Sequence, residues 1–350
     1  MRIALTRRTD FTNFDGVNRF IALLAEALAK LGHDPFIVSL CNGVKDEVKR
    51  WFKEAHGLDN EIPKYTLRQK CGSSWLGVAW DWWQKGSKLL REKSAEVAIV
   101  NGVVPLRFSP KIIVNHGIYT PGMPTDPLYV QAARLLYRSY DVVVCVSNKL
   151  RGEVKSTLGV DCRVIPLPMK LDLYKPASPE ERENVVVHIG TSPIKNPQIS
   201  IEAVKILKRR GYEVKLVIIG RPSDTPSNEI VEFRGLLPPI SIPSILCRSK
   251  ALLLPSTYEA LPYVTLEAMA RGTPPVVSTA VPEEVVIDGY NGLRVHSLHP
   301  RDYAAALERL LTDQELWLKL SRNGREFVKQ FNYIEIANKY INLIKNLYGR

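Results

Sequence analysis

The fold is decided by Leu254-Pro-Ser-Thr-Tyr-Glu-Ala-Leu-Pro-Tyr-Val-Thr-Leu-Glu-Ala-Met-Ala-Arg-Gly-Thr-Pro-Pro275, which predicts the end of a buried strand, a loop and a helix. Pro262 fits the first helical position, where a proline gives up no helical hydrogen bond. Neither Ala260 nor Leu261 has a side chain that can cap the helix, so its first amides keep their partial positive charge. Such a helix start suits a phosphate group.

Short β-branched runs alternate with amphipathic helical stretches on both sides of this segment, the pattern of parallel strands joined by crossover helices. The expected strands are 3–6, 36–40, 97–100, 112–115, 142–146, 164–165, 185–189, 214–219, 251–254 and 275–278. The expected helices include 17–31, closed by Gly32, one that Asn196 caps and that runs from Pro197 to Gly211, and Tyr333 to Tyr348 at the end of the chain.

Two domains are expected, because 350 residues exceed the size at which one hydrophobic core usually keeps growing. The polar stretch from Lys175 to Asn184 has the composition of a linker or domain edge, and the alternation of strands and helices starts afresh after it. Two Rossmann-like units in tandem place a ligand at the carboxyl ends of their strands.

Several activities that use this kind of fold are disfavoured by missing motifs. No strand leads into Gly-x-Gly-x-x-Gly, so a nicotinamide dehydrogenase is not expected, and no Gly-x-x-x-x-Gly-Lys-Ser/Thr loop of a kinase or ATPase occurs. No Asp-x-Asp and no histidine and carboxylate cluster is available for Mg²⁺ or Mn²⁺. We therefore expect no cofactor and a metal-independent reaction.

Composition indicates a soluble protein that attracts anions. Hydrophobic residues make up 45% of the chain and charged residues 24%, and the net charge of +12 favours nucleotides, anionic lipids or nucleic acid as partners. The N-terminus turns polar too soon for a signal peptide, so we expect a cytoplasmic protein. Five cysteines without a Cys-x-x-Cys pair are expected to be reduced and structural.

The quoted stretch closely resembles glycosyltransferase family 4, through Glu259 and Glu267 in a Glu-x7-Glu element with both flanks in place. The resemblance covers nearly the whole chain. It implies the GT-B fold, an α/β architecture with two Rossmann-like doubly wound domains that face a central cleft. The implied domains are an acceptor-side domain, 1–168 with a final helix over about 332–350, and a donor-binding domain, 169–331. It also implies retention of the anomeric configuration.

The resemblance assigns roles to these carboxylates and to a second motif, His188-Ile-Gly-Thr-Ser-Pro-Ile-Lys-Asn196. Glu267 is expected to bind the ribose hydroxyls of the donor, Glu259 to face the transferred sugar, and Lys195 to bind the diphosphate. The family usually has an arginine near Thr191 or Ser192, which this chain lacks, and Arg221 is a substitute by position. The remaining expected donor-binding residues are Gly190, Thr191, Leu237, Leu261, Pro262, Tyr263 and Val264.

In the first half, Phe14-Asp-Gly-Val-Asn-Arg-Phe20 resembles the glycine loop of the family. Gly16 is expected near the donor phosphates, with Asn18 and Arg19 at the acceptor. His116, in Asn115-His-Gly117, resembles the active-site histidine that touches the donor sugar, so His116, Glu259 and Lys195 are the expected catalytic residues. The chain departs from the family at 167–170, where an asparagine and a glycine are usual.

The expected function is transfer of a sugar from a UDP-, GDP- or ADP-sugar to a glycan, a lipid-linked acceptor or a small molecule. The sequence does not choose among these donors and acceptors. Alternatives with the same fold are a phosphorylase, an epimerase and a non-catalytic nucleotide-sugar binding protein. A nucleic-acid binder has only the net charge in its favour, and no recognisable module supports it.

Two segments combine basic residues with tryptophan, Lys45 to Lys53 and Ser74 to Lys85. On a helix, Trp75, Trp82 and Trp83 would share a face, as in a segment that lies at an anionic membrane surface. The alternative is that these tryptophans belong to the core or line an acceptor pocket. Peripheral contact with the inner face of the membrane therefore stays an open hypothesis.

Overall fold

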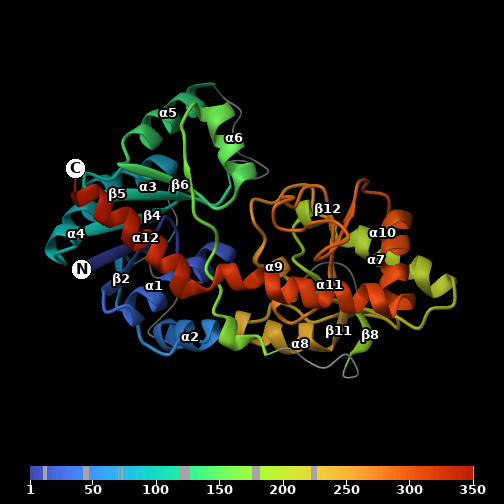
Figure 1. Cartoon of the computed structure of the whole chain (residues 1–350). Helices are drawn as coiled ribbons and strands as arrows, with labels where there is room; N and C mark the ends of the chain where they lie inside the picture. Colours follow the sequence, from blue (N-terminus) through green and yellow to red (C-terminus); the bar gives the residue numbers. More distant parts are fainter. Residues whose placement is uncertain are drawn as a thin grey trace. The chain divides into compact units, whose positions relative to one another are not determined.

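The computed structural model describes residues 1–10, 14–41, 47–69, 71, 74–117, 127–175, 182–221 and 227–349, without the side chains of 47–51, 75 and 127–129. The chain forms two compact units, Met1–Met169 with Phe331–Arg350, and Lys170–Gln330. These limits lie one residue from those expected from the sequence. Each unit contains a parallel β-sheet flanked by helices (Figure 1).

The first unit contains a seven-stranded parallel sheet with the order β3-β2-β1-β4-β5-β6-β7. The strands are β1 (Arg2–Arg7), β2 (Asp34–Cys41), β3 (Lys64–Arg68), β4 (Val97–Asn101), β5 (Lys111–Asn115), β6 (Val142–Cys145) and β7 (Arg163–Val164). The helices are α1 (Gly16–Lys30), α2 (Glu47–His56), α3 (Trp75–Asp81), the π-helix η1 (Trp82–Gly86), α4 (Ser87–Glu92), α5 (Pro127–Arg138) and α6 (Asn148–Leu158).

Helix α12 (Tyr333–Tyr348) returns to this unit and packs on α1 (Figure 1). The ring centroids of Phe20 and Tyr340 lie 6.1 Å apart with their planes at 67°, and the Lys30 ammonium lies 5.5 Å from the Tyr333 ring. Tyr348 donates a hydrogen bond of 2.7 Å to the carbonyl of Glu96. The last helix is thus part of the first unit's core.

The second unit contains a six-stranded parallel sheet with the order β10-β9-β8-β11-β12-β13. The strands are β8 (Glu183–Ile189), β9 (Lys215–Ile219), β10 (Val231–Phe233), β11 (Ser249–Leu254), β12 (Pro275–Ser278) and β13 (Leu293–Val295). The α-helices are α7 (Pro197–Arg209), α8 (Ile242–Arg248), α9 (Tyr263–Ala270), α10 (Pro300–Thr312) and α11 (Gln314–Phe327), and short 3₁₀ turns are η2 (Leu171–Leu173), η4 (Pro193–Lys195), η5 (Pro239–Ser241) and η6 (Val328–Phe331), the last of which ends at the unit boundary.

The second sheet is buried on both faces. Successive residues of its strands point to opposite faces and belong to two different hydrophobic clusters. Val186 belongs to the cluster covered by α7, α10 and α11, and its neighbour Val187 belongs to the cluster covered by α8 and α9. Because both faces are covered, the central strands read as continuous apolar runs. This arrangement leaves the loops at the strand ends as the places where polar side chains gather.

The expectation that the cysteines are reduced is wrong for four of the five. Cys41 is joined to Cys71, and Cys145 to Cys162, over sequence separations of 30 and 17 residues. The second pair meets because β7, which follows Cys162 directly, pairs with the end of β6. The spacing of the cysteines along the chain does not indicate which of them lie close together in the fold. The fifth cysteine, Cys247, is free.

Candidate active site

The second unit brings two loops together at the carboxyl ends of β8 and β11. The amide of Thr257 donates to the Ile194 carbonyl at 2.8 Å, and the side-chain amide of Asn196 donates to the Pro255 carbonyl at 2.8 Å. Asn196 was expected to cap α7, but it adopts a left-handed conformation and makes no side-chain cap. Its side chain instead ties the loop after β8 to the loop after β11.

Lys195 and Glu259 meet across these two loops. The Lys195 Nζ lies 2.5 Å from Glu259 Oε1, and the Ser256 hydroxyl donates to the same oxygen at 2.7 Å. Glu259 is 7% exposed, whereas Lys195 is half-buried. The buried carboxylate holds the lysine at the strand ends, and an ammonium group has three hydrogens with which to reach an anion.

Gly190 permits the approach of Lys195 to the end of β8. Its φ is +107°, and a Cβ atom built there would lie 3.0 Å from Lys195 Cγ. A side chain would therefore be strained and would also crowd the lysine. Both observations explain why glycine stands at this position.

Thr191 lies beside the loop after β9. Its hydroxyl donates to the Arg221 carbonyl at 3.0 Å, and a Cβ on Gly220 would come within 2.6 Å of Thr191 Cγ2. The structure thus brings Arg221, whose side chain is exposed, next to the position where the resemblance expects an arginine. Its role as a substitute stays a prediction.

His188 holds the turn at Gly190 through a hydrogen bond to its carbonyl. Sequence reasoning did not predict it as a site residue. Its Nε2 lies 2.7 Å from the Gly190 carbonyl oxygen and its Nδ1 lies 2.8 Å from the Ser200 hydroxyl. A carbonyl only accepts, so Nε2 carries the proton and Nδ1 accepts from Ser200. Complete burial lowers the pKa of His188 to about 4, so the ring is neutral.

Helix α9 begins at Tyr263, one residue later than expected, with Pro262 at the N-cap position and no side-chain cap. Glu267 is 3% exposed, and Tyr174 donates a hydrogen bond of 2.9 Å to its Oε1. Arg271, one turn further along, donates to the carbonyls of Leu173 and Lys175. These bonds fix the segment around Tyr174 beside α9. Tyr174 is a further site residue that sequence reasoning missed.

The other expected donor-binding residues lie around the same helix. Leu261 and Tyr263 are buried at the start of α9, and Val264 and Leu237 pack against the cluster beneath it. The apolar side chains therefore support the loops. Their expected part in donor binding, largely through the backbone in the case of Leu237, stays a prediction.

The first unit carries the remaining predicted residues at the ends of its central strands. Asp15 caps α1 by accepting from the Asn18 amide at 2.8 Å, and it pairs with Arg7 at 2.6 Å. Gly16 is the exposed first residue of α1, whereas Asn18 and Arg19 are 0% and 3% exposed. Their acceptor role stays a prediction.

His116 follows β5, and its Nε2 lies 2.8 Å from Asn101 Oδ1. The Phe20 ring packs on the imidazole in a T-shaped arrangement, with centroids 4.8 Å apart. Burial, and to a smaller extent Arg7, lowers the pKa of His116 to about 3, so the ring is neutral at physiological pH. Asn101, which sequence reasoning did not single out, is 1% exposed.

Two models of known protein families match the chain. Residues 172–327 match the model of glycosyl transferases group 1, and residues 14–173 match that of glycosyltransferase family 4. The chain belongs to glycosyltransferase family 4. The α/β fold class expected from the sequence is confirmed by the two parallel sheets and by the solved structures that this glycosyltransferase resembles.

Two similar solved structures cover nearly the whole chain. Sucrose-phosphate synthase from Thermosynechococcus elongatus has a TM-score of 0.81 at 18% identity and covers 100% of this chain and 99% of its own. Alr3699/HepE from Anabaena, solved with UDP and glucose, has a TM-score of 0.79 at 17% identity and covers 99% and 100%. At such identities these likenesses show the GT-B fold alone.

Curated relatives are closer in sequence over shorter stretches. The uncharacterized glycosyltransferase MJ1178 of Methanocaldococcus jannaschii is 29% identical over 204 residues, 55% of this chain and 56% of that protein. The alpha-D-kanosaminyltransferase of Streptomyces kanamyceticus is 28% identical over 226 residues, 57% and 58%. The matches thus span little more than half the length of these relatives.

The tryptophan segment of this glycosyltransferase does not form the expected face. Trp82 is fully buried and its indole Nε1 donates to the Arg8 carbonyl at 3.4 Å, so it belongs to the core. Trp75 and most of Lys45 to Lys53 lie outside the described side chains. The exposed face carries Leu76 and Trp80, 71% and 57% exposed, with the Trp83 ring 5.3 Å from Trp80.

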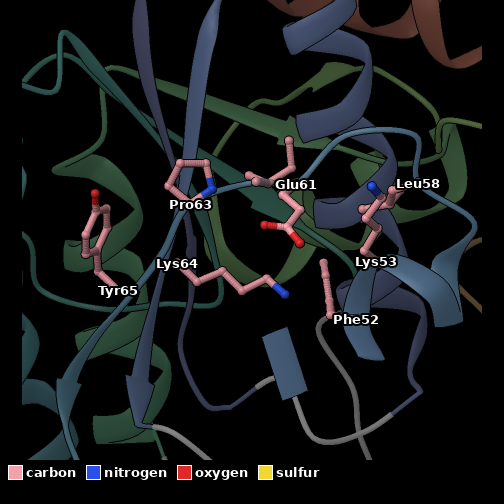
Figure 2. Close-up of a pocket in the computed structure, with 8 residues that line it drawn as sticks. Phe52, Lys53, Leu58, Glu61, Pro63, Lys64 and Tyr65 are labelled. Atoms are coloured by element: carbon pink, nitrogen blue, oxygen red, sulfur yellow. The ribbon is translucent and has the colours of Figure 1, made fainter. Parts of the chain in front are cut away.

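A cavity of about 440 Å³ lies between α2 and β3 (Figure 2). It is lined by Phe52, Lys53, Leu58, Glu61 and the segment 62–65, and the Lys64 ammonium lies 3.6 Å from the Phe52 ring centroid. None of the predicted site residues lines it. We assign it no part in the reaction.

Over the described ranges, one group of side chains has the spacing of metal ligands, namely Asp10, Cys41 and Cys71. Its two sulfurs are bonded to each other, so as it stands the group offers one carboxylate. No helix within the described part of the chain is long and apolar enough to cross a membrane.

Proposed function

We propose that this glycosyltransferase moves a sugar from a nucleoside diphosphate sugar to an acceptor, with retention of configuration and without a metal ion. The observation that carries the proposal is the Lys195 and Glu259 pair at the strand ends of the second unit, beside the Gly190 turn. The acceptor is a glycan, a lipid-linked acceptor or a small molecule. The fold does not determine which of these three acceptors is used.

Lys195 is suited to the leaving group. Departure of a nucleoside diphosphate builds negative charge on the β-phosphate, and a fixed ammonium lowers the energy of that state. The uncapped start of α9 adds the partial positive charge of its amides. These two groups supply the charge stabilisation that a divalent cation supplies in other transferases.

Glu267 is suited to the ribose. Its buried carboxylate takes one hydrogen bond from Tyr174, and a carboxylate has further lone pairs for the two ribose hydroxyls. UDP is the first nucleotide to test, because the similar structures of Alr3699/HepE and of the Staphylococcus aureus protein TarM were solved with UDP. GDP and ADP remain in the comparison.

Nucleotide binding without metal tests this proposal. UDP, GDP and ADP are compared by thermal shift in EDTA, on wild type, Glu267→Gln and, as a control on the edge strand β10, Glu232→Gln. A ligand at about 100 times its Kd stabilises the folded state by roughly 2.7 kcal/mol. We expect one nucleotide to stabilise wild type and the control but not Glu267→Gln; no shift in any protein, or a shift only with added metal, contradicts the proposal.

Product analysis separates transfer from related activities. With the nucleotide identified, retention is read from the anomeric signals of the product by NMR. An epimerase converts the donor without an acceptor, and a phosphorylase consumes inorganic phosphate. Either result replaces the transferase proposal.

We also propose that the surface formed by Leu76, Trp80, Trp83, Arg91 and Arg107 contacts the anionic inner face of a membrane. Arg107 lies 4.6 Å over the Trp83 ring, and Arg91 donates to the Arg107 carbonyl at 2.9 Å. With Gln84, Trp83 and the two exposed arginines line a surface cavity of about 610 Å³. Indole rings at headgroup depth beside guanidinium groups match the chemistry of anionic lipids.

Sedimentation with vesicles tests this contact. Each basic residue near an anionic surface adds about 1 kcal/mol of attraction, so Arg91→Gln with Arg107→Gln is expected to weaken binding to phosphatidylserine vesicles by tenfold or more at low salt. The matched control is Lys319→Gln with Arg322→Gln, which removes equal charge from α11. Equal loss in both double variants indicates attraction by net charge alone and contradicts the assigned surface.

A further inference from the structure

We infer that Asn101 is a positioning residue that holds His116 in one tautomer, with the proton on Nε2 and the Nδ1 lone pair left as a hydrogen-bond acceptor. The ligand group that this acceptor fits is a sugar hydroxyl. That last step rests on the proposed function, whereas the tautomer rests on the geometry of the first unit alone.

Three adjacent strands bring the residues together. Strand β4 lies between β1 and β5, and Asn101, its last residue, is in register with Arg7 on one side and Val114 on the other. His116 follows β5 by one residue. The side chain of Asn101 is therefore buried between the ends of both neighbouring strands.

Hydrogen bonding decides which way the Asn101 amide points. One end lies 3.1 Å from the backbone carbonyl of Thr6, which can only accept, so this end is the Nδ2 donor. The other end is then Oδ1, which lies 2.8 Å from His116 Nε2. Because Oδ1 has no hydrogen to give, Nε2 must be the donor.

The rest of the environment keeps the ring in this orientation. Asn115 fixes the backbone after His116, since its Oδ1 accepts from the Gly117 amide at 2.8 Å while its Nδ2 lies 2.9 Å from the Tyr137 hydroxyl. Phe20 packs against the imidazole. A flipped ring would place a carbon against Asn101 and lose the bond to Oδ1.

A neutral imidazole with its proton on Nε2 has a lone pair on Nδ1. Within the described residues Nδ1 makes no hydrogen bond. It is therefore able to accept from a hydroxyl group, which a ring protonated at Nδ1 could not do. Asn101 thus decides whether His116 offers an acceptor or a donor to its ligand.

Nitrogen-15 NMR of the histidine side chains in the full chain tests the tautomer directly. The His116 signals are assigned by their loss in His116→Gln. We expect the wild type at pH 7 to show a protonated Nε2 and an unprotonated Nδ1. Protonation of Nδ1 in the wild type overturns the inference.

Two variants at Asn101 test its cause. Asn101→Leu removes the acceptor and is expected to give a mixture of tautomers, whereas Asn101→Asp keeps an acceptor and is expected to keep the tautomer and to raise the pH at which His116 titrates. The control, Tyr140→Phe, removes another buried hydrogen bond of the first unit, to the Val104 carbonyl, and is expected to leave the His116 signals unchanged. If Asn101→Leu does not fold, an unchanged His116 titration in Asn101→Asp overturns the inference.

Kinetics of transfer tests the consequence for the sugar. With the donor identified, Asn101→Leu is expected to lower kcat at least about tenfold with little change in the donor KM, because the lost bond is to the transferred sugar and not to the nucleotide. Unchanged kcat in a variant with mixed tautomers overturns the assignment to the sugar. If the wild type transfers no sugar at all, the proposed function fails, while the NMR result still decides the tautomer.

Discussion

Tyr174 donates a hydrogen bond of 2.9 Å to Glu267 although the two residues are 93 positions apart. The hydroxyl holds one oxygen of the carboxylate that we propose for the donor ribose. A residue from a distant part of the chain thus holds the carboxylate that α9 carries.

Tyr174→Phe is expected to weaken nucleotide binding about three- to tenfold, because the carboxylate loses a bond worth about 1 kcal/mol that orients it. Isothermal titration with the nucleotide measures the change. Tyr212→Phe is the matched control, since Tyr212 also donates to a glutamate of this unit, Glu308, at 2.8 Å but outside the site. Equal losses of affinity in both variants would show that the effect is one of general stability.

Gly190→Ala is expected to reduce nucleotide affinity more than tenfold, because the new methyl group is strained at φ +107° and displaces Lys195. Gly211→Ala is the control, with φ +90° and nothing within 4 Å of the added Cβ. Both variants are expected to lose about 1 kcal/mol of stability in urea unfolding. The prediction fails if their nucleotide affinities are alike.

Glu259→Gln is expected to lower kcat at least tenfold. Nucleotide affinity is expected to be kept or increased, because Lys195 loses a negative partner that competes with the diphosphate. Steady-state rates and titration measure the two effects. Glu202→Gln, which removes an exposed partner of Lys205, serves for comparison and is expected to change neither. A fall in affinity with unchanged kcat would reverse the assigned roles.

The stability of the protein is expected to fall as the pH is lowered from about 6.5 towards 4. His188 has its pKa lowered to about 4 by burial, so it stays neutral in the folded protein while it takes up a proton in the unfolded chain. Its contribution is fully present above the unfolded pKa of about 6.5 and decreases by up to about 1.4 kcal/mol per pH unit below it. Urea midpoints of wild type and His188→Asn between pH 8 and 4.5 measure this, and equal slopes would contradict it.

Much of the fold can be predicted from the sequence, because parallel strands that are buried on both faces consist of continuous β-branched runs. Val185 to Ile189 and Val142 to Val146 are examples that the structure keeps. The edge strands β3, β10 and β13 were not predicted. The residues of β3 are half-buried and mostly polar, and β10 and β13 have three residues each, so no periodicity marks them.

The tryptophan face failed for a geometric reason. The prediction placed Trp75, Trp82 and Trp83 on one helical face, but Trp82 and Trp83 are consecutive residues and so point about 100° apart around a helix. Trp82 turns into the core against Gly86, where an added Cβ would lie 2.8 Å from the ring.

The site was predicted in part because its motifs are local. Lys195, Glu259 and Glu267 each stand in a short pattern, and the structure brings Lys195 and Glu259 together. Tyr174 holds Glu267 and Asn101 holds His116, each from another element, and neither stands in a motif, whereas His188 begins the motif of Lys195 but has no expected role there. Their roles depend on which strands and loops become neighbours, and this is decided only in the folded chain.

Helix α12 also sets the order in which the protein can mature during synthesis. The apolar side of α1 packs against a helix that the ribosome makes only after the entire second unit, a delay of roughly ten to thirty seconds at about 5–20 residues per second. The nascent first unit must persist for that time with part of its core surface open. A chaperone that shields α1 during this interval would bind the same face that Tyr340 later covers.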